Sequence, residues 1–254
     1  MKQVIFSALI CLTGIWAQAQ STETRQATTE ATKLEVKNGI EVIITQNDTV
    51  ALKVEADNAA ILQKVVTKYN GSTLKVYLIN LDSDVMTGAV TVYLSQKSLP
   101  EIKAEGSAAI KAAGKWKLQN AEINLASGAT FTGQLEVVGN FKVTAASGSG
   151  FRGIIHAGTF KANIMGGAYA KVQGTANFAH IYCSSGSLQA GKLVCQSAEV
   201  TAQNASAICI QAKEFIKAET DTSSSVTYYG EPERRQLGDN TYAVKRNTSR
   251  LSLN

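Results

Sequence analysis

Residues 141–167 read FKVTAASGSGFRGIIHAGTFKANIMGG, in which alternating apolar residues lead to a small Ser/Gly segment and the pattern then begins again. Similar small segments recur along the chain, at intervals of 22, 20, 19, 19, 19 and 19 residues. They begin at Glu105, Ser127, Ser147, Gly166, Ser185, Asn204 and Ser223. Such a period is typical of stacked units that are each too small to bury their own apolar face.

The units have the alternation of β-strands, as at Phe141, Val143 and Ala145, and no helical periodicity. Gly and Ser at the recurring step fit a tight corner. About 19 extended residues give a perimeter of roughly 60 Å, enough to enclose a core. We therefore predict an all-β protein, a right-handed parallel β-helix with about 19–20 residues per coil over residues 105–227. A propeller blade needs about twice this period, and a leucine-rich horseshoe needs Leu and Asn positions that are missing.

The N-terminus has the pattern of an export signal. Lys2 precedes an apolar run over 4–16, and Ala17-Gln18-Ala19 is a small-x-small cleavage site. The run is too short to span a bilayer, and no later segment is longer. We expect a signal peptide over 1–19 and export to the periplasm, the cell surface or the medium, with no transmembrane segment in the mature chain.

The remaining segments differ from the repeat in composition. Residues 20–32 are polar and predict a flexible leader. Residues 33–104 alternate around Asn38-Gly39 and Asn70-Gly71, which are hairpin signals, and predict a β-rich N-terminal cap. A Gly/Pro turn followed by a short strand predicts a C-terminal cap over 228–254. Such caps would cover the unpaired strands at the ends of the helix.

Composition excludes several kinds of site. The net charge of +5 is mild and forms no basic run, which argues against nucleic-acid binding. Beyond the signal the cysteines are Cys183, Cys195 and Cys209, an odd number for which burial without a disulfide is the simpler expectation. His156 and His180 are 24 residues apart, out of step with the repeat. We expect no metal and no cofactor.

Carboxylates are also poorly placed for catalysis. Residues 140–198 contain no Asp or Glu, whereas β-helical polysaccharide lyases and hydrolases use clustered carboxylates. The same stretch contains five basic residues, which are candidates for binding an anionic glycan or a surface macromolecule if they share a face. They are Lys142, Arg152, Lys161, Lys171 and Lys192. The alternative is that these side chains only keep a β surface soluble.

The order of these features resembles a known family. The β-rich start Leu34-Glu-Val-Lys-Asn-Gly-Ile-Glu-Val-Ile-Ile is followed by the Ser-Gly turns and by Val226-Thr-Tyr-Tyr-Gly-Glu-Pro. Over roughly 33–246 this is similar to the head GIN domain family of Gram-negative envelopes, also labelled "putative auto-transporter adhesins". The resemblance implies a β-helical fold and no established enzymatic activity. We expect an exported envelope protein that acts in binding or adhesion without catalysis. A carbohydrate-active enzyme and a purely structural envelope protein remain the alternatives.

Overall fold

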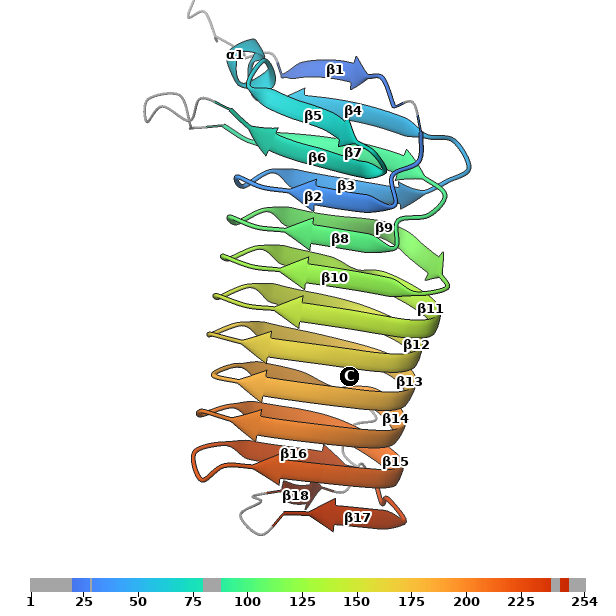
Figure 1. Cartoon of the computed structure of the whole chain (residues 1–254), viewed down its shortest axis with the longest axis vertical. Coiled ribbons are helices and arrows are strands. Elements are labelled where there is room, and N and C mark those ends of the chain that lie inside the picture. Colours follow the sequence, from blue (N-terminus) through green and yellow to red (C-terminus); the bar gives the residue numbers. More distant parts are fainter. Residues whose placement is uncertain (1–19, 28, 80–87, 239–242, 247–254) are drawn as a thin grey trace, which may run out of the picture.

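The computed structural model describes residues 20–27, 29–79, 88–238 and 243–246. These residues form a β-solenoid of about 7 turns with 18 strands and a single short helix (Figure 1). The expected signal peptide lies outside the described residues. In Figure 1, below the antiparallel strands at the top, the strands nearest the viewer run to the left, those behind run to the right, and successive coils descend. The winding is therefore right-handed, as the sequence predicts.

Each coil contributes to two facing sheets, which we call the front sheet and the rear sheet after their positions in Figure 1. Five long strands bend and so belong to both sheets. They are β11 (Thr130–Ala145), β12 (Gly150–Met165), β13 (Tyr169–Ser184), β14 (Ser187–Gln203) and β15 (Ala207–Thr220). Their pairing is parallel from coil to coil, with Phe131 beside Phe151 in the rear sheet and Phe141 beside Phe160 in the front sheet.

The other strands complete one sheet each. In the front sheet these are β5 (Val65–Asn70), β6 (Thr73–Leu78), β2 (Lys33–Val36), β8 (Glu101–Ala104), β10 (Ala121–Leu125) and β17 (Arg234–Leu237). In the rear sheet they are β1 (Ser21–Arg25), β4 (Ala51–Ala56), β7 (Val90–Gln96), β3 (Glu41–Gln46), β9 (Ala109–Leu118), β16 (Ser225–Tyr229) and β18 (Ala243–Arg246).

The core lies between the two sheets. Along β11, as in most coils, alternate residues point inward and are buried, while their neighbours face solvent. Phenylalanines from both sheets meet at the centre: Phe131 stacks on Phe151 with ring centroids 5.4 Å apart, and Phe141 lies 5.8 Å from Phe151 and 5.6 Å from Phe160. Such contacts stabilise beyond the burial of area alone.

The Ser/Gly segments form the corners between the rear and front sheets. Ser147 and Gly148 both adopt left-handed backbone, with φ of 53° and 72°, and Ser127 and Gly128 repeat this geometry one coil earlier. Successive corners are joined by backbone hydrogen bonds, as from Gly128 N to Ser147 O at 3.0 Å. A side chain other than glycine is strained in this conformation, which explains the small residues of the repeat.

The turn at Asn38-Gly39 is a correction to the sequence prediction. Its φ values of 65° and 69° match a hairpin signal, but β2 and β3 do not pair with each other. They form a complete coil that lies between the coil of β6 and β7 and the coil of β8 and β9, parallel to both. Asn38-Gly39 is the corner of that coil, and Asn70-Gly71 alone of the two joins an antiparallel hairpin.

The segment expected to be a flexible leader differs from that expectation. Residues Ser21–Arg25 pair antiparallel with β4, and the Arg25 guanidinium donates to Val65 O at 2.6 Å and Leu62 O at 3.3 Å. Together with β4, β5 and the helix α1 (Ala59–Leu62), this strand covers the N-terminal end of the solenoid. The sequence did not predict this strand because its residues are polar. Hydrogen bonds, rather than the burial of apolar side chains, hold it in place.

At the other end, the expected C-terminal cap continues the solenoid as far as it is described. The strands β17 and β18 pair parallel with β15 and β16. Much of residues 228–254 lies outside the described part of the chain.

Candidate functional site

The five predicted basic residues divide between the two sheets. Lys142 and Lys161, which are 19 residues apart, are register partners in the front sheet. Arg152 and Lys171 are likewise partners in the rear sheet, and Lys192 follows there on β14, beside Gln173. A full coil of 19 residues returns to the same sheet, and half a coil leads to the opposite one. The five residues therefore do not share a face.

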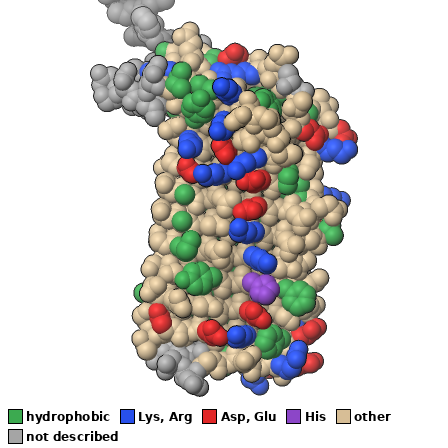
Figure 2. Space-filling model, in the orientation of Figure 1, with side chains coloured by type: hydrophobic (Ala, Val, Ile, Leu, Met, Phe, Trp, Pro, Cys, Tyr) green, Lys and Arg blue, Asp and Glu red, His purple; other side chains and the backbone are tan. Residues whose placement is uncertain are grey.

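The outer surface of the front sheet balances its charges. Charged side chains of both signs stack along it in register, with Glu101 beside Glu122, then Lys142 beside Lys161, and then His180, Glu199 and Lys217 (Figure 2). The Lys142 ammonium lies 2.9 Å from Glu122 Oε1, and this hydrogen bond, with a second from Asn124, lowers the pKa of the Glu122 carboxyl. Each such exposed pair contributes at most about 1 kcal/mol, but together they leave little net charge.

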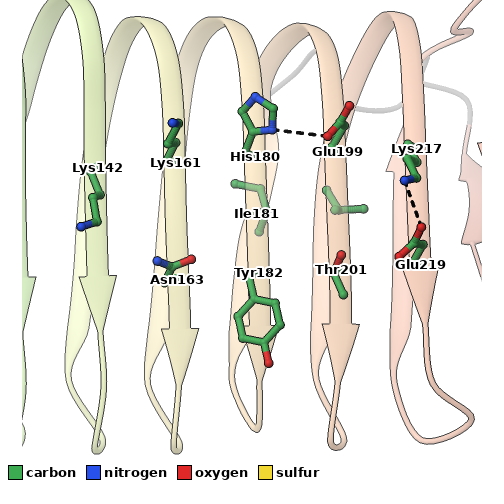
Figure 3. Close-up of a pocket in the computed structure, with 11 residues that line it drawn as sticks. Lys142, Lys161, Asn163, His180, Ile181, Tyr182, Glu199, Thr201, Lys217 and Glu219 are labelled. Atoms are coloured by element: carbon green, nitrogen blue, oxygen red, sulfur yellow. Dashed lines mark ion pairs between the residues drawn. The ribbon is translucent and has the colours of Figure 1, made fainter.

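A shallow hollow on the front sheet shows the same balance. Figure 3 shows Lys142 and Lys161 on its lining beside His180, whose Nδ1 lies 3.5 Å from Glu199 Oε2. Farther along, Lys217 and Glu219 are 3.1 Å apart. Side chains of both signs line this hollow, since Glu199 and Glu219 lie among its three lysines, so its positive charge is partly neutralised.

The rear sheet has two hollows, of about 500 and 480 Å³. At each hollow the register between neighbouring strands shifts. On β9, residues 112–114 have no partner in β11, and on β14, residues 191–193 have no partner in β15. Bulges of this kind bend a strand and redirect its side chains. Here they open the surface on either side of Arg152 and Lys171.

Between the hollows, an aromatic ring lies under a guanidinium. Gly150 lies beside Tyr169, and a side chain at Gly150 would overlap the Tyr169 ring, so the ring covers the glycine. The Arg152 guanidinium is 5.3 Å from the centre of that ring, and its Nη2 donates to the Tyr169 hydroxyl at 3.4 Å. This cation–π contact fixes a cation whose opposite side faces solvent.

The second hollow repeats the combination of tyrosine and glycine. A Cβ at Gly191 would come within 2.9 Å of the Tyr229 ring, and the Cys209 thiol donates to the Tyr229 hydroxyl at 3.5 Å. Lys192 follows Gly191 in the bulge and is exposed, as is Lys171 on the other side. The hollow therefore has an aromatic ring near two ammonium groups.

The lining of the rear hollows contains no Asp or Glu. Lys111, at one end, pairs with Glu41 at 2.5 Å. Within the described part of the chain, no carboxylate pairs with Arg152, Lys171 or Lys192. From β9 to β16 the hollows cross seven successive strands, or about 29 Å at ~4.8 Å per step. We call this strip, lined by Lys111, Thr132, Gln134, Arg152, Tyr169, Lys171, Gln173, Gln189, Lys192 and Tyr229, the rear groove.

Nucleophiles and metal ligands are not concentrated at this surface. Cys183, Cys195 and Cys209 are free, and burial raises the pKa of the first two to about 12, which keeps these thiols protonated. Among the described residues, no three His, Cys, Asp or Glu side chains are grouped to hold a metal ion. No helix in the same part of the chain is long and apolar enough to cross a membrane.

A family model described as "Putative auto-transporter adhesin, head GIN domain" matches residues 31–232. The chain belongs to the head GIN domain family. The match covers most of the solenoid and confirms the resemblance expected from the Ser/Gly corners and the Tyr-Gly-Glu-Pro ending. A comparison with curated protein sequences gives no match.

Solved structures share the fold of this head GIN domain. A "putative lipid binding protein" from Parabacteroides distasonis superposes with a TM-score of 0.80 at 18% identity, over 89% of this chain and 96% of the other. A "putative adhesin" from Parabacteroides merdae gives 0.80 at 16% identity, over 89% and 96%. Another from Bacteroides fragilis gives 0.65 at 17% identity, over 91% and 97%. At these identities the similarity shows the fold alone.

The sequence prediction missed the uncharged side chains of the rear groove in this head GIN domain. Tyr169 and Tyr229 are too far apart in sequence to suggest one surface, and Gln173 and Gln189 belong to no motif. The sequence did contain a signal for assigning the basic residues to the two sheets. Residues 19 apart lie in the same sheet, whereas residues 9 or 10 apart lie in opposite sheets. The two bulges, which shape the hollows, have no comparable signal.

Proposed function

We propose that this head GIN domain is an exported, non-catalytic binding protein of the cell envelope that holds an extended anionic macromolecule in its rear groove. The observation that carries the proposal is a strip about 29 Å long, at ~4.8 Å per strand, in which three cations have no carboxylate partner among the described residues. Positive groups in a row attract a polyanion by long-range electrostatics and release its counterions on binding.

The absence of catalysis is part of the proposal. The carboxylates that a glycosidase or lyase would need lie mainly in the front-sheet ladder, where Lys142 and Lys217 pair with them. The sequence pattern at residues 1–19 supports export, and the family description supports an adhesive role. A purely structural role, in which Arg152, Lys171 and Lys192 only keep the surface soluble, predicts no binding that depends on these three residues.

Charge reversal in the two sheets tests the proposal. Residues 20–254 are applied at low salt to immobilised heparin, alginate and polyphosphate, and to vesicles with anionic lipid. The rear variant R152E/K171E/K192E is compared with a front variant of identical net charge, K142E/K161E/K217E. We expect retention of the wild type and the front variant on at least one polyanion, retention that falls steeply with salt, and none of the rear variant.

Two outcomes would overturn this proposal. One is a wild-type protein that no anionic polymer retains. The other is a loss of retention that is equal in both triple variants, since net charge alone would then explain it. Retention by vesicles only would point to a lipid surface as the partner, in agreement with the description of the Parabacteroides distasonis neighbour, and would exclude a soluble polymer.

A further inference from the structure

We infer that the occupant of the rear groove is an acidic polysaccharide, and that one of its sugar rings lies on Tyr229 in the hollow between Lys171 and Lys192. This rests on the proposed function and names its ligand class. The hollow combines three kinds of group that a charged pyranose needs: an aromatic face, neutral hydrogen-bonding side chains, and cations at the rim.

The aromatic face is built into the fold. Tyr229 is held at its hydroxyl by the Cys209 thiol, at 3.5 Å, and its ring occupies space that a side chain at Gly191 would fill. The bulge over residues 191–193 removes the neighbouring strand contact at this point and leaves the hollow open. Sugar rings present C–H groups that pack on such a flat apolar surface.

The neutral side chains suit hydroxyl groups rather than a bare phosphate chain. Gln173 and Gln189 line the hollow with Thr227, and each glutamine offers both a donor and an acceptor. In register, Gln189 lies beside Lys171 and Gln173 lies beside Lys192. Each ammonium therefore has an amide next to it, an arrangement that fits a carboxylate or sulfate attached to a hydroxylated ring.

The length of the groove fits a chain of such units. Tyr169, covering Gly150 under the Arg152 guanidinium, lies on β13, and Tyr229 lies on β16, three strands away. The two rings are thus separated by about 14 Å along the solenoid axis, at ~4.8 Å per strand. Through Ser187 and Ala207, the residue in register with Tyr169 is Ser225, four residues before Tyr229, so the two rings are also offset along the strands. A polymer that crosses the groove obliquely can contact both tyrosines, whereas a single lipid headgroup can occupy only one hollow.

The test removes the aromatic face without changing charge. Affinities for acidic oligosaccharides (oligogalacturonate and alginate oligomers), a neutral oligosaccharide of equal length and inorganic polyphosphate are measured by calorimetry for the wild type, Y229A, Y229F and the control F178A. Phe178 is 53% exposed and lines none of the rear hollows. We expect Y229A to lose at least tenfold in affinity for an acidic oligosaccharide while polyphosphate binding stays within about twofold, with Y229F and F178A near wild type.

G191V provides a second approach if Y229A unfolds, because a valine there displaces the ring with the tyrosine retained. Equal affinity of wild type and Y229A for acidic oligosaccharides would overturn the sugar subsite while leaving the polyanion function intact. Binding of polyphosphate but not of acidic oligosaccharides would do the same. A wild type that binds none of the polyanions would instead remove the proposed function itself.

Discussion

The front and rear sheets are made by the same coils, yet their outer surfaces differ in charge pairing. Acidic and basic side chains form ion pairs on the front sheet, whereas three cations of the rear groove have no carboxylate partner among the described residues. On the front sheet, Lys142 has Glu122 as its register partner and as its ion-pair partner. On the rear sheet, Lys171 lies between Arg152 on the preceding coil and Gln189 on the following coil. One repeat therefore provides two surfaces, and the side chains on the adjacent coils decide whether a cation is neutralised or left available.

The largest effect is expected when carboxylates are placed beside the cations of the rear sheet, as they are on the front sheet. In Q173E/Q189E each new carboxylate lies beside Lys192 or Lys171, so an internal ion pair competes with the ligand. Retention on an anionic polymer should weaken about ten- to hundredfold, since opposing charge at an interface costs on the order of 1–3 kcal/mol. Salt-gradient elution measures this effect. The isosteric front change N163D, far from the groove, is the control, and an equal loss there would contradict a rear site.

The corners belong to both sheets and should separate stability from binding. Gly148 has a φ of 72°, and no atom lies within 4 Å of the position that a Cβ would take, so strain alone opposes a side chain there. We expect G148V to lower the free energy of unfolding by about 1–2 kcal/mol, seen as a lower melting temperature, with ligand affinity unchanged.

Two further variants refine this corner test. S147G removes backbone strain at a φ of 53°. Glycine also gives the unfolded chain more conformational entropy, which opposes this gain, so the free energy of unfolding should change by less than about 1 kcal/mol. G186V should destabilise for another reason, because a Cβ there lies 3.0 Å from Ile164 O and 3.1 Å from Ala168 O. An unchanged melting temperature in both G148V and G186V would contradict a structural requirement for glycine at these corners.

The converse change should give the front sheet part of the rear sheet's behaviour. In E122Q/E199Q the partners of Lys142 and His180 are neutral, and Lys142 and Lys161 form an uncompensated pair on adjacent coils. Introduced into the rear triple variant, these substitutions should restore weak, salt-sensitive retention of a few-fold above background. If retention stays at background, unpaired cations alone are not sufficient to bind the polymer, and the shape of the rear groove is also required.

The smallest effect concerns pH. The Glu122 carboxyl has a lowered pKa, mainly because Lys142 donates to it, so its stabilising contribution is complete above the unfolded value of 4.5 and is lost as the pH falls through the lower folded value. For an exposed pair this amounts to less than about 1 kcal/mol. Urea unfolding at pH 7 and pH 3 should show a smaller acid loss in E122Q than in wild type. An identical loss would assign the acid sensitivity to other carboxylates.

The period, the corners and the β class could be predicted because they are local properties of each coil. The placement of β2 and β3 between later strands could not, since parallel pairing joins residues far apart, and Asn38-Gly39 has the same left-handed geometry in a corner as in a hairpin. For the site, the candidates Arg152, Lys171 and Lys192 were identified by charge alone. Their separation from Lys142 and Lys161 depends on coil phase, and the hollows depend on bulges that no residue pattern marks.

The inserted coil also has a consequence for the order of folding. Strands β2 and β3, at residues 33–46, have neighbours on both sides that come from residues 73–118. Closing contacts over such separations is slow because chain entropy is lost before the contacts form. Between residues 121 and 220, by contrast, each coil is stacked directly on its predecessor. A nucleus should therefore arise in this middle part and grow outward, so a chain emerging N-terminus first must wait for its later coils before its first one can be completed.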